Sequence, residues 1–594
     1  MKSFFQAFFA AFLAHLLVIG VGIFFLFAMV ASMGPKPPVV PDKAVLVFDL
    51  NRALPDGVME DAPATVLQKA LQGGSLGQYT PLPLLIKALE RAAVDPKISG
   101  LFITGNLQSA MFGGGAALLE LKQALNLFKE KKPVISYNQV WGRGELYLCS
   151  GLGTMYINPF GNVEMIAPAA NLMFFSNAFK KYGIDVQVTK VGKYKSAVEP
   201  FIQDKASAEN IEQIKGYLGE IWEGAKAEIA KGRGIESSDI QRLANTKLAM
   251  NVAESVDAKL VDKPAYYDEV LDELKKMVGK AAGVKEFPQI DIDTYAKVPG
   301  VPQKGRNRIA VVVAEGDIVD GDGGPSQIGG DDLARELRDL RLNKNVKAVV
   351  MRVNSPGGSA SASDVILREV TTLKNAGKPV VVSMGNVAAS GGYWISSAAD
   401  YIFAEPVTVT GSIGVFGMLP NALKFANDHG ITFDSVELGD MGAPSLFRPM
   451  KPKELDRVQA LVDYVYDTFL ENVSKGRKLE KNKVNEIAQG RVWAGRKALE
   501  LGLVDALGGL QDAVKKAAEL AKIEGDYRVD VPGTPQTVFE RLIKNMGGSE
   551  KRKLIKAGAF DTAKNELEEA LLRLRSLNDP NGVYALAPVG VTIK

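Results

Sequence analysis

A serine followed by two glycines is the feature of this sequence that most directly suggests covalent chemistry. Ser390 ends a run of small residues in NVAASGGYW (386–394), and Gly391 and Gly392 come next. Such a turn exposes the hydroxyl and leaves a backbone N–H beside it that can stabilise an oxyanion. A serine hydroxyl is a weak nucleophile until a neighbouring base takes its proton. If Ser390 is a nucleophile, another part of the chain has to supply that base.

Histidine, the base in most serine hydrolases, is scarce in this chain. The sequence has 2 histidines, His15 and His429. His15 lies within an apolar N-terminal segment, and His429 follows a predicted helix in NDHG (427–430), where a capping role is more common. A carboxylate could act instead. Lysine is the known alternative partner of a serine, provided that burial lowers its pKa by several units.

A second glycine-rich turn, NSPGGSA (354–360), also follows a predicted strand and precedes a predicted helix. The carboxyl ends of parallel strands meet at one edge of a sheet, where ligands of α/β proteins bind. We therefore expect an oxyanion hole made by the N–H of Gly391 and an N–H of the Pro-Gly-Gly turn. The alternative is that both segments are ordinary tight turns, in which glycine is common.

The chain repeats itself, and the repeat separates the serine from its candidate base. The N-terminal copy has Arg143 at the position of the serine, and it has KVGKYKSAVEP (190–200) where the C-terminal copy has ELGDMGAPS. One copy would supply the serine and the other a lysine. The residues alone do not choose among Lys190, Lys193 and Lys195, and a solvated basic loop is the alternative. The repeat is visible in three pairs of segments: 132–159 with 378–406, 180–196 with 426–442, and 251–262 with 494–505.

The elements that must position these residues alternate between strands and helices. RIAVVVAEG and VKAVVMRVN are apolar runs typical of buried strands, whereas DDLARELRDLRL has helical spacing. This alternation predicts βαβ units and a parallel sheet covered by helices. We expect four parts: an anchor and proline-rich spacer (1–42), two copies of one fold (43–297 and 298–525), and an extension (526–594) that is a docked helix or a mobile tail.

The N-terminus and the composition limit the class of protein. Residues 3–35 contain no Asp, Glu, Lys or Arg, so the segment is long enough to be a retained transmembrane anchor and too long for the usual cleaved signal. The net charge is +3, from 71 basic and 68 acidic residues, which gives no indication of nucleic-acid binding. The chain has 1 cysteine, which excludes an internal disulfide framework and a multi-cysteine zinc site.

Four motifs resemble those of the signal peptide peptidase A (SppA) family in its long, membrane-anchored, duplicated form. They are NSPGGSASAS (354–363), AASGGYWIS (388–396), TVTGSIGV (408–415) and YKSAVEPF (194–201). The resemblance covers nearly the whole chain and implies a fold related to the ClpP and crotonase group. The expected fold class is therefore α/β: two tandem copies of a ClpP/crotonase-like fold, each a parallel sheet with covering helices, after an N-terminal transmembrane helix.

The resemblance implies a role for each motif. Ser390 would be the nucleophile, Lys195 the general base, and Ser412 the residue that orients the lysine. The N–H groups of Gly391 and Gly358 would form the oxyanion hole. No metal ion or organic cofactor is implied.

The resemblance also implies substrates, location and assembly. The expected activity is that of a membrane-bound serine endopeptidase with a Ser–Lys dyad that degrades remnant signal peptides after their release by leader peptidase, and other hydrophobic peptides. The expected assembly is a bowl-like homotetramer. A single N-terminal span would hold it in the bacterial inner (cytoplasmic) membrane, with the catalytic body in the periplasm.

Two other functions fit parts of the sequence. A crotonase-like acyl-CoA enzyme shares the glycine-rich oxyanion turns, but it would use carboxylates in place of a serine–lysine pair and gives no reason for an anchor. An inactive membrane scaffold would keep the fold, but the joint presence of Ser390, Lys195 and Ser412 argues against it. A serine-reactive covalent probe distinguishes both from a peptidase.

Overall fold

The structure, a computed structural model, describes most of the body of the chain. The described residues are 38–57, 80–107, 114–281, 285–299, 305–324, 326–439, 441–442, 445–531, 583–587 and 592–593. Among them, none of the helices is both long and apolar enough to cross a membrane. The predicted anchor at 3–35 lies outside the described residues, as does most of the predicted extension.

The first sheet has a parallel core made of four consecutive strands. It contains β1 (Ala44–Asp49), β2 (Ile98–Thr104), β3 (Val134–Gly142), β4 (Thr154–Glu164), β7 (Met250–Asn251), β8 (Lys263–Pro264) and β9 (Gln289–Asp291). β1 to β4 pair in chain order, each parallel to the next. β9 extends the sheet beside β1, and β7 and β8 pair with β4 at the opposite edge.

The second sheet repeats this order in the C-terminal half. It contains β10 (Asn307–Glu315), β13 (Val346–Ser355), β15 (Val380–Ala389), β16 (Tyr401–Ala404), β17 (Val409–Gly411), β19 (Val492–Ala494), β20 (Ala506–Leu507) and β21 (Tyr527–Asp530). β10, β13 and β15 are parallel neighbours, and β21 lies beside β10 as β9 lies beside β1. Every residue of β15 is buried, as expected for a parallel strand covered on both faces. The predicted boundary at residue 525 falls just before β21.

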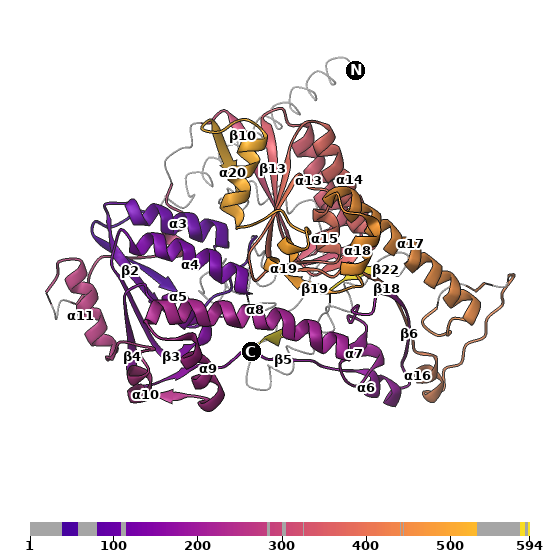
Figure 1. Ribbon diagram of the computed structural model, residues 1–594, viewed down its shortest axis with the longest axis horizontal. Coiled ribbons are helices and arrows are strands. Elements are labelled where there is room, and N and C mark those ends of the chain that lie inside the picture. Colours follow the sequence, from indigo (N-terminus) through magenta and orange to yellow (C-terminus); the bar gives the residue numbers. More distant parts are fainter. Residues whose placement is uncertain are drawn as a thin grey trace, which may run out of the picture.

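Helices flank both sheets, as the alternating pattern predicted (Figure 1). Those of the N-terminal half are α3 (Leu82–Val94), α4 (Gly115–Lys129), α5 (Arg143–Cys149), α6 (Ser176–Lys181), α7 (Glu199–Ile202), α8 (Ala208–Arg233), α9 (Ser237–Thr246), α10 (Val252–Asp257), α11 (Tyr267–Met277) and α12 (Ile292–Ala296). Those of the C-terminal half are α13 (Gly330–Leu342), α14 (Ala360–Asn375), α15 (Gly391–Ser396), α16 (Leu423–Asp428), α17 (Pro452–Arg477), α18 (Lys481–Ile487), α19 (Gly495–Glu500) and α20 (Leu510–Leu520).

A third sheet joins segments that are far apart in the sequence. Its order is β12-β11-β14-β22-β18-β6, with β6 (Asp185–Val191) from the N-terminal half. β6 pairs antiparallel with β18 along its whole length, so the chain crosses from one half into the other just before the lysine cluster. The remaining strands are β5 (Ala170–Asn171), β11 (Asp317–Val319), β12 (Gln327–Gly329), β14 (Gly357–Ser359), β18 (Val415–Asn421), β22 (Val583–Leu586) and β23 (Thr592–Ile593).

The two aligned segments 180–196 and 426–442 have different structures. The first contains β6, whereas its counterpart has no strand among the residues described there. The reason is the pairing: β6 has β18 as a partner, and α8 then returns the chain beneath both halves to the first sheet (Figure 1). The two copies therefore differ at this point, and the pairing of β6 with β18 places the lysine cluster next to the C-terminal copy.

A buried charge cluster holds the two halves together next to the second sheet. Arg352 on β13 lies 2.8 Å from a carboxylate oxygen of Asp56 and 2.7 Å from one of Glu120. All three side chains are almost fully buried. Removing one member would leave an unpaired buried charge, which typically costs about 3–5 kcal/mol. The halves are thus fixed relative to one another where the site requires it.

Candidate active site

Ser390 occupies a strained turn between a buried strand and a helix. It follows β15 and precedes α15, and its backbone has φ 55° and ψ −115°. Positive φ is uncommon outside glycine, and such strain clusters at functional sites. The turn is fixed by two backbone hydrogen bonds: the Ser390 N–H donates to the Gly411 carbonyl at 2.8 Å, and the Trp394 N–H donates to the Ser390 carbonyl at 2.7 Å.

The two glycine-rich turns meet, as the sequence predicted. A methyl group on Gly391 would lie 3.0 Å from Gly357 Cα and 2.8 Å from Ser363 Oγ. A methyl group on Gly392 would lie 2.5 Å from the Ser355 carbonyl oxygen. Since neither position has room for a side chain, the glycines are required by the close approach of the turns. The Gly391 N–H and the Pro-Gly-Gly turn consequently lie on one side of Ser390.

Lys195 reaches Ser390 from the N-terminal half. It lies in the turn between β6 and α7, is fully buried, and its Nζ is 2.7 Å from Ser390 Oγ. The same Nζ is 3.2 Å from both the hydroxyl and the carbonyl oxygen of Ser412. Three residues from three separate segments therefore surround one amine.

Burial controls the charge of this amine. It lowers the pKa of Lys195 well below its usual range, because a charged ammonium loses its hydration in a buried site. A neutral amine has two N–H groups and one lone pair. The two Ser412 oxygens can accept the two N–H groups, which leaves the lone pair facing the Ser390 hydroxyl. The arrangement can therefore remove a proton from Ser390.

Ser412 is itself held in an unusual backbone conformation. Its φ is 49°, and its N–H donates to the Arg491 carbonyl at 2.7 Å. It comes directly after β17, the neighbour of β15, so the sheet places it beside Ser390. The side chain is fully buried together with Lys195. This position explains how a serine more than twenty residues after Ser390 in the sequence contacts the same amine.

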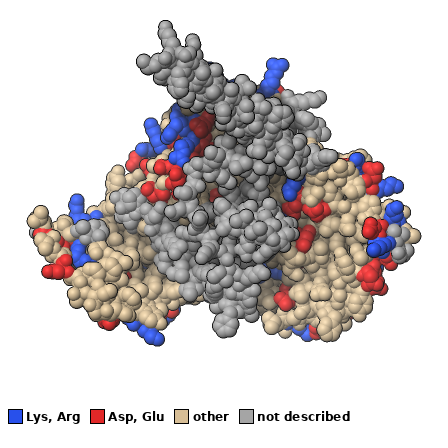
Figure 2. All heavy atoms as spheres, turned by 180° about the vertical axis from the view of Figure 1, so that it is seen from behind, with Lys and Arg blue, Asp and Glu red and all other residues tan. Residues whose placement is uncertain are grey.

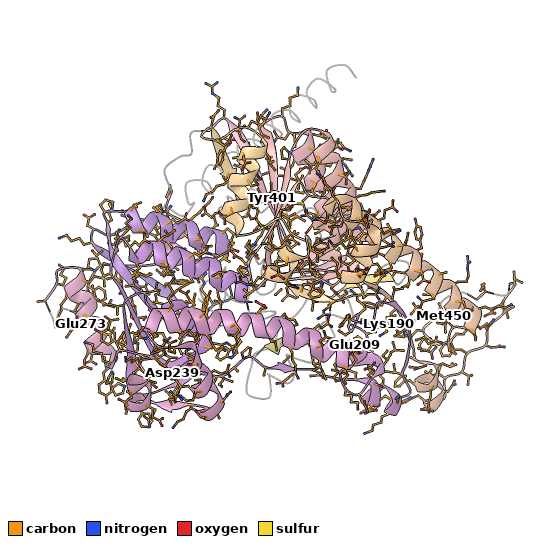
Figure 3. The ribbon with its side chains drawn as sticks, in the orientation of Figure 1. Lys190, Glu209, Asp239, Glu273, Tyr401 and Met450 are labelled. Atoms are coloured by element: carbon orange, nitrogen blue, oxygen red, sulfur yellow. The ribbon has the colours of Figure 1, made fainter. Side chains whose placement is uncertain are left out.

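The other basic candidates do not contact Ser390. Lys190 lies on β6 with an exposed side chain (Figure 3), and Lys193 is exposed with its Nζ 5.0 Å from the centre of the Tyr194 ring. His429 is exposed at the end of α16, where its Nδ1 lies 2.7 Å from the Phe425 carbonyl. The sequence alone did not exclude these three side chains as the base. In the structure, Lys195 contacts Ser390 and they do not.

A turn at residues 489–491 positions the lysine, and sequence reasoning missed it. The Gln489 carbonyl accepts the Tyr194 N–H at 2.9 Å, and the Gly490 N–H donates to the Ile413 carbonyl at 2.8 Å. Gly490 has φ 74°, and a methyl group there would lie 2.7 Å from Lys195 Cβ. The turn therefore links the lysine loop on one side to the Ser412 segment on the other.

Arg491 reinforces this turn through its side chain. Its guanidinium lies 4.7 Å from the centre of the Tyr194 ring and 4.4 Å from that of Trp493. It also forms an ion pair of 2.7 Å with Glu212 on α8. No sequence motif marked AQGRVW (488–493). The available signal was a glycine, Gly490; its positive φ and the lack of room for a side chain there are visible in the structure.

Polar side chains under the lysine loop complete its support. Gln213 Nε2 donates to the Tyr194 carbonyl at 3.2 Å and to Ser196 Oγ at 2.9 Å. Asn210 Oδ1 accepts the Ser196 hydroxyl at 2.9 Å, and Glu199 accepts the Asn210 amide at 2.9 Å. These buried groups form hydrogen bonds with one another, which makes a rigid support for Lys195.

In the described ranges, no three His, Cys, Asp or Glu side chains cluster as metal ligands would.

Comparison with known proteins gives consistent matches. The model of peptidase family S49 matches residues 126–281 and 372–524. "Protease 4" of Salmonella typhi is 34% identical over 571 residues, which cover 91% of this chain and 90% of that protein. "Serine protease SPPA, chloroplastic" of Arabidopsis thaliana is 31% identical over 484 residues, covering 79% of this chain and 70% of that protein. A ClpP1 mutant from Listeria monocytogenes covers 34% of this chain at 14% identity, with a TM-score of 0.24, which is too low to support an argument about the fold.

Proposed function

The chain belongs to peptidase family S49 and is a serine peptidase, and we propose that it cleaves apolar peptides with a Ser390–Lys195 dyad assembled from its two halves. The observation that carries this proposal is the 2.7 Å distance between Ser390 Oγ and the fully buried Lys195 Nζ. A strained serine and a lysine of lowered pKa are the two groups that covalent catalysis at neutral pH requires.

In the proposed mechanism, each residue has one task. Neutral Lys195 takes the Ser390 proton as the hydroxyl oxygen attacks the substrate carbonyl. Ser412 keeps the lone pair of the amine directed at Ser390. Gly391 and Gly358 donate their N–H groups to the oxyanion, and one such donor is typically worth about 3 kcal/mol in the transition state.

The reaction then completes in two proton transfers. The Lys195 ammonium protonates the leaving amine, which breaks the peptide bond and leaves an ester on Ser390. Lys195 next activates a water that hydrolyses the ester and restores the hydroxyl. The Lys195 ammonium is a stronger acid in this dry site than in water, since burial lowers its pKa. The same burial therefore serves both the base and the acid step.

We also propose remnant signal peptides as the substrates, from the apolar character of the chain around the site. β14 and β18 lie on either side of β22. An extended peptide that takes the place of β22 would bind between them by strand addition. The apolar cluster of Ala197, Val198, Phe416 and Met418 lies next to this position. An apolar peptide released in a membrane by leader peptidase has the matching chemistry.

A membrane-anchored assembly is proposed on separate grounds. Residues 3–35 carry no charged side chain, which supports a membrane anchor. We propose that this anchor lies in the inner membrane and that the body is in the periplasm, as the family resemblance implies. The segment after α16 exposes several apolar side chains, including Phe433, Val436 and Leu438. Such a surface favours contact with another protein surface, in keeping with the proposed homotetramer. On the face seen in Figure 2, the described Lys and Arg side chains lie among Asp and Glu, so nothing there favours nucleic acid.

The test is hydrolysis of a fluorogenic apolar peptide by the detergent-solubilised full chain. Lys195→Met should lower kcat/KM by several orders of magnitude, because it removes the base and keeps the volume. Lys193→Met is the matched control: the side chain is two residues away, exposed, and absent from the site. Near-normal hydrolysis by the Lys195 variant, with a normal circular dichroism spectrum, would show that the base lies elsewhere.

A further inference from the structure

One glutamine side chain, Gln213, links the lysine loop to a strand beside the serine turn. It lies on α8, from the N-terminal half, and is 2% exposed. Its Nε2 donates to the Tyr194 carbonyl at 3.2 Å and to Ser196 Oγ at 2.9 Å, the residues on either side of Lys195. Its Oε1 accepts the Val492 N–H of β19, in the C-terminal half, at 3.2 Å. One amide therefore contacts both halves at the site.

The partners settle which way the amide of Gln213 points. A backbone carbonyl such as that of Tyr194 only accepts a hydrogen bond, and a backbone N–H such as that of Val492 only donates one. The Nε2 must therefore face Tyr194, and the Oε1 must face Val492. An ionised carboxylate has no donor for the carbonyl, and an apolar side chain has neither donor nor acceptor. Such a replacement would leave a buried backbone group unpaired, which is costly.

The contact with Val492 continues through the backbone to the nucleophile. Val492 pairs antiparallel with Gly411 of β17. The Gly411 carbonyl in turn accepts the Ser390 N–H at 2.8 Å. The Oε1 of Gln213 is thus connected to the serine turn by two backbone contacts, and its Nε2 holds the two neighbours of Lys195.

Apolar packing holds α8 in place next to the serine strand. Ile214 and Tyr217 follow Gln213 on the helix and are buried. They belong to one apolar cluster with Val387 and Ala389, at the end of β15. Since β15 leads directly into the serine turn, α8 is packed against the strand that carries the nucleophile. The amide of Gln213 therefore extends from a fixed helix.

We propose that Gln213 is a positioning residue, which fixes the backbone on both sides of Lys195 relative to the serine turn and so directs the amine at Ser390. This inference rests on the proposed dyad. Gln213 takes no proton and acts through Lys195. A displacement of a catalytic group by about 1 Å typically costs about 10²-fold in rate, so a loss of this size is expected when the amide is removed.

The first experiment is hydrolysis of the fluorogenic apolar peptide by Gln213→Met in the detergent-solubilised full chain. Methionine has a similar length and removes both contacts. The kcat should fall by about 10²-fold. The KM should change by less than about twofold, because the residue acts through the base.

Gln241→Met is the matched control, because this glutamine also bonds to α8. Its Oε1 accepts the Trp222 indole N–H at 2.7 Å and the Lys226 amine at 3.0 Å. Both partners lie at least about 14 Å further along α8 than Gln213. This variant loses a comparable set of hydrogen bonds far from the amine, and its kcat should stay within about twofold of the wild type.

A second measurement separates positioning from stability. The rate at which a fluorophosphonate labels Ser390 is followed from pH 5 to 10. In Gln213→Met, the maximal rate should be lower and the ionisation should move to higher pH, because a displaced Lys195 amine regains hydration and holds its proton more tightly. A purely structural role would lower the urea unfolding midpoint and leave the ionisation where the wild type has it.

Gln213→Asn tests the reach of the amide and is the second variant should Gln213→Met not fold. It keeps the amide but is one methylene shorter, so it cannot reach both halves and should also be slow. Wild-type kcat and pH profile in either variant overturn the positioning role and leave the dyad standing. Loss of the native circular dichroism spectrum in both variants assigns the residue to folding and overturns the inference. A wild-type ionisation that persists in Lys195→Met overturns the proposed dyad as well.

Discussion

The same turn occurs in both halves of the molecule, and only one of the two turns carries a nucleophile. In the C-terminal half, β15 leads through Ser390 into α15, with Ser390 at φ 55°. In the N-terminal half, β3 leads through Gly142 into α5, with Gly142 at φ −85° and ψ 173°. The strand–turn–helix scaffold is shared, whereas the strained backbone is found where the serine is. The scaffold alone therefore does not make a site.

The N-terminal turn has become structural. The sequence alignment placed Arg143 opposite Ser390, but in the structure Gly142 holds that position between strand and helix, and Arg143 is the first residue of α5. The Arg143 side chain donates to the Ile166 carbonyl at 2.7 Å. Glu145 on the same helix accepts the Leu107 N–H at 2.7 Å, so a carboxylate lies near the helix N-terminus. That arrangement would repel an oxyanion. The N-terminal half contributes Lys195 instead, because its strand β6 pairs with β18 of the other half. Among its described residues, the C-terminal half has no counterpart of β6.

The largest difference between the two halves is expected when one side chain is removed from each of the two turns. Ser390→Ala should lower kcat by about 10⁴-fold or more, because it removes the hydroxyl that lies 2.7 Å from the Lys195 amine. Arg143→Ala should change kcat/KM less than about threefold, since the N-terminal turn makes no contact with Lys195. Both are measured with the fluorogenic peptide. A large loss in the Arg143 variant, with unfolding behaviour unchanged, would mean that the N-terminal turn takes part in the reaction.

The 489–491 turn gives the next largest effect. Gly490→Ala should lower kcat/KM by about 10²-fold, since the new methyl group would lie 2.7 Å from Lys195 Cβ and displace the base. Gly430→Ala is the control: its φ of 79° is nearly the same, but nothing lies within 4 Å of the added methyl. Both variants carry the same backbone strain. Equal activities in the two would exclude a positioning role for the turn.

Stability should report the buried amine independently of activity. Unfolded Lys195 binds a proton up to its ordinary pKa of about 10.4, whereas folded Lys195 releases it at a lower pH. The wild type therefore gains stability as pH rises through this window, by about 1.4 kcal/mol per pH unit from this residue. Lys195→Met lacks that term and should be the more stable protein near neutral pH.

The difference between the two proteins isolates Lys195 from other titrating groups. Lys122, whose pKa is lowered by burial to about 8, contributes equally to both and cancels. Urea unfolding midpoints measured between pH 7 and 10 should converge as pH rises. A constant difference over this range would mean that Lys195 is charged in the folded protein.

The smallest effect is expected from the side chain that stacks on the lysine loop. Arg491→Ala should lower kcat/KM by about 3- to 10-fold, which corresponds to about 1 kcal/mol for a lost cation–π contact. The loss should fall on kcat, since the residue acts through Lys195. Arg496→Ala, an exposed arginine nearby in the sequence, is the control. A loss confined to KM would place Arg491 in substrate binding instead.

Local patterns predicted the scaffold and the serine turn well. Apolar runs such as 346–354 became buried strands, and the glycines of the two turns were required by close approach. The choice of Lys195 over Lys190 and Lys193 came only from the family resemblance. Its physical reason is β6, whose pairing with β18 joins residues more than 200 positions apart. Spacing along the chain does not encode such a pairing.

The C-terminal extension was predicted as a docked helix or a mobile tail; most of it lies outside the described residues, and the described part contains the strands β21, β22 and β23. β21 lies beside β10, and β22 lies between β14 and β18. A strand of four residues is too short for its alternation of side chains to be recognised in the sequence. β22 has pairing partners on both sides, β14 and β18, which the sequence does not reveal.

The most direct test of the central claim is the rate at which a serine-reactive fluorophosphonate labels Ser390, measured from pH 5 to 10. Labelling reports activation of the hydroxyl without the need for a peptide. In the wild type, the rate should rise with a single ionisation, as Lys195 loses its proton below its ordinary pKa. In Lys195→Met, the labelling should be slow and this ionisation should disappear. An unchanged profile in that variant would contradict a serine of one half being activated by a lysine of the other.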